Sequence, residues 1–64
     1  MNVKVEDLRA GNTVWVDGYM GIILTIAEKP DWYNIYFKIP QGLPLADFYL
    51  SKLIKKNLEM ELIG

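Results

Sequence analysis

Two strands and the tight turn between them can be identified in residues 13–28, TVWVDGYMGIILTIAE. Val14 and Val16 alternate with Trp15 and its polar neighbours, as in a strand with one buried face. The dipeptide Asp17-Gly18 favours a two-residue hairpin turn, because both residues tolerate positive φ angles. A second strand is expected over residues 20–28, where simple alternation leaves both faces largely apolar. The stretch therefore predicts a β-hairpin whose second strand needs cover on two sides.

Further strands are expected on both sides of this hairpin. The clearest one covers residues 32–39, where apolar residues alternate with more polar ones over eight positions. A loop at residues 40–44, with two prolines and a glycine, leads to a short strand at residues 47–50. The last segment, residues 53–63, favours a strand, although its leucines also fit helical spacing. Residues 3–12 predict a short strand followed by one helical turn.

The number and length of these elements predict the fold class. About five short strands are too few for a sandwich, so they indicate an all-β domain whose strongly bent sheet closes into a small barrel. The 64 residues have room for one domain, residues 1–64, with a thin core. Apolar residues make up 52% of the chain, and there is no cysteine for a disulfide. This apolar excess predicts that several copies associate into a homo-oligomer.

The residue types leave little material for catalysis. The chain has no histidine and no cysteine, and Ser51 is its one serine, so no nucleophile has an imidazole base. Glu59 and Glu61 are two positions apart, which is how a strand directs charges to solvent. No spacing typical of a metal site occurs. We therefore expect a protein that is not an enzyme and that uses no cofactor and no metal.

Charge and hydropathy restrict the partners. Seven basic and eight acidic residues give a net charge of −1, so any contact with nucleic acid must be local. Lys52, Lys55 and Lys56 form the single basic cluster, which suits either a solvated turn or phosphate contacts. No apolar run approaches the ~18 residues of a membrane span, and no signal peptide is evident. These features predict a cytoplasmic protein that does not bind membranes.

Aromatic residues are the more informative candidates for a binding surface. Trp15, Trp32 and Tyr36 occupy the polar phase of their strands, where an aromatic ring is accessible to solvent. Exposed rings can stack on bases or anchor a protein partner. They can equally cover the ends of a thin barrel or fill a contact between subunits.

Three short motifs occur in a characteristic order along the chain. Residues 14–23 combine alternating valines, a glycine turn and a second glycine, Gly21. Residues 31–37 read DWYNIYF, and residues 54–58 read IKKNL. Together they resemble the Sm/LSm family, including its bacterial Hfq-like members and the Sm-like proteins of marine phages. The family's second motif is Ile-Arg-Gly-Asn or Asp, so this chain has lysines where the family has arginine and glycine.

The resemblance implies a barrel of Sm type and a homo-oligomeric ring that binds single-stranded RNA or DNA. It implies that Tyr33 stacks on a base and that Asn34 donates or accepts a hydrogen bond there. It further implies that Lys55, Lys56 and Asn57 lie near phosphates at the pore. Such a protein would act in RNA or DNA processing or regulation, in the cytoplasm of a bacterial or phage-infected cell.

A second hypothesis uses the same small barrel for another purpose. A barrel of Src-homology type would form a protein-interaction module, with Trp15, Trp32 and Tyr36 lining an aromatic groove for an extended or proline-rich segment. A phage-encoded modifier of a host protein would fit this description.

Overall fold

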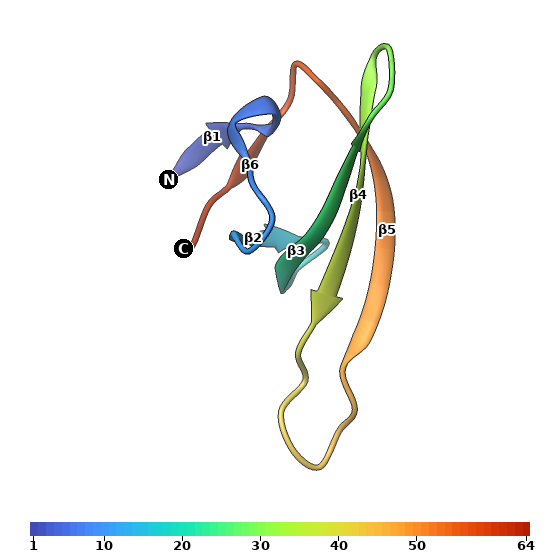
Figure 1. Ribbon diagram of the computed structural model, residues 1–64. Coiled ribbons are helices and arrows are strands. Elements are labelled where there is room, and N and C mark those ends of the chain that lie inside the picture. Colours follow the sequence, from blue (N-terminus) through green and yellow to red (C-terminus); the bar gives the residue numbers. More distant parts are fainter.

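The computed structural model describes all 64 residues and contains six strands in two antiparallel sheets (Figure 1). The larger sheet has the order β2-β3-β4-β5, formed by Thr13–Val16, Tyr19–Glu28, Trp32–Ile39 and Phe48–Lys55. The smaller sheet pairs β1 (Asn2–Lys4) with β6 (Glu59–Glu61). One 3₁₀ turn, Val5–Asp7, follows β1. The predicted all-β class is therefore confirmed, together with the helical turn near the N-terminus.

The central hairpin has the geometry that its sequence predicts. Asp17 and Gly18 have φ angles of 50° and 84°, which is the left-handed region that a type I′ turn requires. Val16 pairs with Tyr19 immediately outside this turn, and Val14 pairs with Gly21. Val14 and Val16 are buried while Trp15 between them is exposed, so the predicted alternation in β2 is correct.

An irregularity in β3 changes which side chains face the core. Ile23 pairs with Phe37, but Thr25 pairs with Tyr36, so Leu24 is an extra residue without a cross-strand partner. Such a bulge bends the strand and shifts its alternation by one position. Ile26 consequently packs against the same core as Ile23, which simple alternation would not allow.

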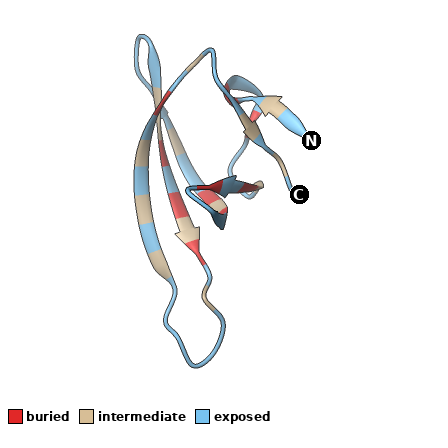
Figure 2. Cartoon of the chain, turned by 180° about the vertical axis from the view of Figure 1, so that it is seen from behind, coloured by how far each residue is buried: buried red, intermediate tan, exposed pale blue.

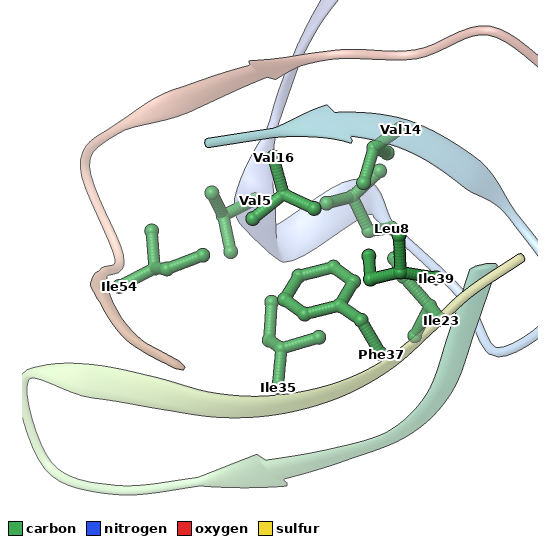
Figure 3. Packing of buried hydrophobic residues seen from close by; sticks show 9 residues of the cluster. All are labelled: Val5, Leu8, Val14, Val16, Ile23, Ile35, Phe37, Ile39 and Ile54. Carbon is green, nitrogen blue, oxygen red and sulfur yellow. The ribbon is translucent and has the colours of Figure 1, made fainter. Parts of the chain in front are cut away.

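The core consists of nine buried side chains between the concave face of the larger sheet and the N-terminal segment. They are Val5, Leu8, Val14, Val16, Ile23, Ile35, Phe37, Ile39 and Ile54 (Figure 3). Buried positions occur along β2, β3 and β4 and once on β5 (Figure 2). Gly21 allows the strands to approach, because a Cβ atom there would lie 2.8 Å from Val16 Cγ1 and 3.0 Å from Ile39 Cδ1. The core is small, as expected for this chain length.

The second half of the chain differs from the sequence-based boundaries. The fourth strand was expected to end at Leu50, but β5 continues to Lys55 because it pairs with the whole of β4. The chain then turns at Lys56 and Asn57 into β6, so the last segment is extended rather than helical.

The predicted closed barrel is wrong. β5 is hydrogen-bonded to β4 alone, and its other edge has no strand partner. β6 pairs with β1. Beyond the end of β6 the chain reaches the larger sheet, where Leu62 forms a bridge with Val14 and backbone hydrogen bonds join Thr13 to Ile63 and Gly64. Because β2 is only four residues long and β6 turns away from β5, the two sheets do not close into a continuous ladder.

Candidate nucleic-acid interface

One end of the larger sheet brings together most of the residues that the sequence proposes for nucleic-acid binding. There the β3–β4 loop and the β5–β6 turn lie side by side, held by a backbone hydrogen bond of 3.2 Å from Lys56 N to the carbonyl of Asp31. Trp32 and Lys55 are direct partners in the β4–β5 register. Neighbouring backbone bonds fix the loop and the turn, so this end of the sheet presents a defined set of side chains.

Two lysines at this end each lie over an aromatic ring. Lys55 Nζ is 5.5 Å from the centroid of Trp32, and Lys56 Nζ is 5.2 Å from the centroid of Tyr33. Both distances fall within the range of attraction between a cation and the face of a ring. Trp32 and Tyr33 are successive residues of β4, so their rings face opposite sides of the sheet, while Lys55 ends β5 and Lys56 begins the turn that follows it.

The two ammonium groups differ in electrostatic environment. Lys56 Nζ donates a 2.6 Å hydrogen bond to Glu28 Oε2, and this bond is the main cause that raises the pKa of Lys56 above the ordinary lysine value. Lys55 makes no ion pair and remains exposed. Of the two lysines that lie over rings, Lys55 is therefore the one whose charge is not offset by a paired carboxylate.

Two shallow hollows flank the β5–β6 turn. The first has a volume of about 450 Å³ and is lined by Pro30, Asp31, Trp32, Lys55, Lys56 and Asn57. The second has a volume of about 390 Å³ and is lined by Lys4, Glu6, Lys56 and Asn57. Most of the residues that line the two hollows are polar or charged, which suits a hydrated ligand with charged groups.

Asn34 does not join the other proposed residues at this end. It lies on the convex outer face of the larger sheet, where its side-chain oxygen accepts a 2.8 Å hydrogen bond from Ser51 Oγ. Tyr33 points to the concave face and packs against the core. Since adjacent residues of a strand face opposite ways, the structure separates the ring and the amide that the family resemblance places at one base.

The three aromatic residues proposed for a binding surface are all exposed, but they are not in one place. Trp15 and Trp32 line the same groove, of about 420 Å³, between the end of β5 and β6. Leu58 and Met60 contribute apolar surface to it. Tyr36 instead lies on the outer face of the larger sheet, where it stacks on Tyr49.

Sequence reasoning missed two groups that shape these surfaces. Glu28 was assigned only to the end of a strand, and its pairing with Lys56 depends on a contact between residues 28 positions apart. Ser51 falls between the predicted strands and Leu53 at the start of a separate last segment, so the sequence does not predict their position beside Asn34 on the outer face of one strand. The alternation of Tyr49, Ser51 and Leu53 in the sequence is the signal that would have revealed it.

The remaining acidic candidates, Glu59 and Glu61, line the groove between the end of β5 and β6. Glu59 and Glu61 lie on the same exposed side of β6. No three side chains among His, Cys, Asp and Glu come together in a way that would hold a metal ion. The 3₁₀ turn is the sole helical element, and no helix meets the length and apolarity needed to cross a bilayer. Comparison of the chain with protein-family models, curated proteins and solved structures gives no match.

Proposed function

We propose that this chain is a non-enzymatic protein that binds single-stranded nucleic acid, with the Trp32–Lys55 end of the larger sheet as its contact surface. The observation that carries the proposal is the pair of lysine ammonium groups, each over an aromatic ring, beside a polar hollow of about 450 Å³. Ammonium groups attract phosphates, and aromatic faces stack on bases without regard to sequence.

The individual side chains have different parts in this proposal. Lys55 contributes the unpaired positive charge, and Trp32 beneath it offers an exposed ring for stacking. Asn57, which lines both hollows, supplies amide donors for phosphate or sugar oxygens. Lys56 is partly neutralised by Glu28, so its contribution to phosphate binding is smaller.

The proposal includes self-association into an Sm-type homo-oligomeric ring. Two features support it: the unpaired edge of β5, and the many exposed apolar side chains of so small a chain. Pairing of this edge with another copy would satisfy its backbone groups and bring several Trp32–Lys55 ends together. The ring would then act in RNA or DNA processing or regulation in the cytoplasm of a bacterial or phage-infected cell.

Two measurements test the proposal. Fluorescent single-stranded oligonucleotides, one of DNA and one of RNA, are titrated with the protein at salt concentrations from about 50 to 200 mM. The logarithm of the affinity should fall linearly as the logarithm of the salt concentration rises. Absence of binding at the lowest salt concentration would contradict nucleic-acid binding. Light scattering should give a mass several times that of the chain, and a monomer at high concentration would contradict the ring.

The groove between the two tryptophans favours a second function. Trp15, Trp32, Leu58 and Met60 form an apolar lining beside the unpaired edge of β5, which suits an extended protein segment. In this alternative the chain is a protein-interaction module of Src-homology type, such as a phage modifier of a host protein. Recovery of one partner from a bacterial lysate despite nuclease treatment would favour it, whereas nuclease-sensitive recovery would favour the first function.

A further inference from the structure

The convex outer face of β4 and β5 carries a second group of aromatic and polar side chains, which meets the hollow of about 450 Å³ at Trp32 and Lys55. Cross-strand pairing places Tyr36 opposite Ser51 and Asn34 opposite Leu53. The outward positions are, on β4, Trp32, Asn34, Tyr36 and Lys38 and, on β5, Tyr49, Ser51, Leu53 and Lys55. We call these eight residues the outer platform. The rings of Tyr36 and Tyr49 on this platform are exposed.

The rings of Tyr36 and Tyr49 lie nearly parallel at the centre of this surface. Their planes differ by 13° and their centroids are 5.9 Å apart. Both remain accessible, with 41% of Tyr36 and 52% of Tyr49 exposed. A stacked pair that keeps this much surface in solvent can accept a further flat, aromatic group.

Next to the rings, the side chain of Asn34 has a hydrogen-bond donor that is free to bind a ligand. Asn34 uses its side-chain oxygen to accept the hydrogen bond from Ser51, and its amide nitrogen has no partner within the chain. That nitrogen is a donor for a base edge or a phosphate oxygen. Asn34 lies between Trp32 and Tyr36 on the same face of β4, so it is one outward position from an exposed ring on each side.

Lysines occupy the two ends of the platform. Lys55 pairs with Trp32 in the register at one end, and Lys38 pairs with Tyr49 near the other. Lys38 is 3.6 Å from Asp47, and both of these side chains are partly exposed, so the ion pair is weak and exchangeable. The outer platform thus has a net positive charge on a chain whose overall charge is negative.

We propose that a single nucleic-acid strand continues from the Trp32–Lys55 end onto the outer platform, with bases stacked on Tyr36 and Tyr49 and phosphates near Lys55 and Lys38. The inference rests on the proposed function and extends it to a defined path. From Trp32 to Lys38 the strand rises by about 20 Å. This length suits on the order of four nucleotides per chain, the lower limit for a single-strand-binding domain.

The chemistry of the platform indicates which strand it would accept. Ring stacking and phosphate attraction tolerate any base, because every base has a π-face. The platform is open and convex, so it suits flexible single strands rather than a duplex whose bases are already stacked. We therefore expect binding of unstructured oligonucleotides with little sequence preference, and weaker binding of the same sequence in a duplex.

The test compares variants that keep or remove the rings. In Tyr36→Ala/Tyr49→Ala the affinity for single-stranded oligothymidylate and oligouridylate should fall at least about tenfold, because stacking on each base contributes roughly 1–3 kcal/mol. The slope of log affinity against log salt should not change, since no cation is removed. In Tyr36→Phe/Tyr49→Phe the affinity should be retained, because a phenylalanine ring stacks without the hydroxyl.

A matched control is available on the other side of the sheet. Tyr19 is similarly exposed but contacts Phe48 edge-on, at 5.3 Å, away from the outer platform. Tyr19→Ala should leave oligonucleotide affinity unchanged. Photo-crosslinking of an oligonucleotide that contains 4-thiouracil should in turn label Tyr36 or Tyr49, a result that a merely structural role of these residues would not produce.

The outcomes separate the inference from the function on which it rests. If the parent protein binds oligonucleotides and the double alanine variant binds equally well, the outer platform is not the path, although the proposed function stands. If the parent binds no oligonucleotide at any salt, both are wrong. If the double variant instead loses a protein partner recovered from a nuclease-treated lysate, the outer platform is a protein-binding face and the inference is overturned.

Discussion

The ammonium group of Lys56 lies 2.6 Å from a carboxylate oxygen of Glu28, and this contact joins the β5–β6 turn to the end of β3. The hydrogen bond raises the pKa of Lys56. A raised pKa means that the charged form is favoured in the folded state. The stabilisation is therefore complete below the ordinary pKa of a lysine and is lost as pH rises through the raised value.

Glu28→Gln should remove this effect. In NMR titrations of the lysine side chains, Lys56 of the parent protein should lose its proton at a higher pH than Lys56 of the variant. Equal Lys56 titrations in the two proteins would show that the contact with Glu28 is not maintained in solution.

Lys55→Ala should weaken oligonucleotide binding and reduce its salt dependence. The removal of one phosphate contact should make the slope of log affinity against log salt concentration less steep by about 0.7 for a single strand. Lys52→Ala is the charge-matched control, because Lys52 is already paired with Asp17 at 2.6 Å and points to the concave face. Fluorescence anisotropy at four salt concentrations is sufficient. If Lys52→Ala reduces the salt dependence of binding as much as Lys55→Ala does, the site is not localised at Lys55.

Gly21→Ala should destabilise the fold although it adds a single methyl group. The new Cβ would lie too close to Val16, Ile39 and Phe37, whose nearest atoms are 2.8, 3.0 and 3.3 Å away. Overpacking of this kind costs about 1–3 kcal/mol. Urea denaturation should show a lower midpoint, while Gly64→Ala, which meets no atom within 4 Å, should not shift it. An unchanged midpoint for Gly21→Ala would mean that the strands separate easily at this position.

Ile35→Val tests how tightly the core is packed. Ile35 is completely buried in the centre of β4, so the loss of one methylene should cost about 0.5–1.5 kcal/mol. The same substitution at the exposed Ile63 should change stability by less than about 0.5 kcal/mol. The midpoints of denaturant unfolding of the two variants are compared with that of the parent protein, provided that the m-value is unchanged. Equal effects at the two positions would indicate a loosely packed interior.

Local sequence signals were sufficient for the central hairpin turn and for β4, but not for the bulge in β3. The Asp17-Gly18 turn and the alternation of residues 32–39 depend on neighbours in the sequence, and the structure confirms both. The extent of β5 was not predictable in the same way, because Ser51 and Lys52 weaken its apolar pattern. Those residues are extended because they pair with Tyr36 and Ile35, and such long-range pairing is not encoded in the local segment.

The candidate site was predictable only in part. Lys55, Lys56 and Asn57 are consecutive, so any turn brings them together, and the structure places Trp32 and Tyr33 beside them. The separation of Tyr33 from Asn34 follows from strand alternation alone. That alternation is a stronger physical constraint than the motif resemblance that placed both side chains at one base.

The bulge at Leu24 has a consequence for how this chain tolerates changes in length. Removal of Leu24 would delete the residue that has no cross-strand partner, so every other side chain of β3 would keep its inward or outward direction. Removal of Ile22 or Ala27 would instead reverse the direction of the residues beyond it and expose part of the core. Among single-residue deletions within this strand, we therefore expect related sequences to vary in length at position 24 first.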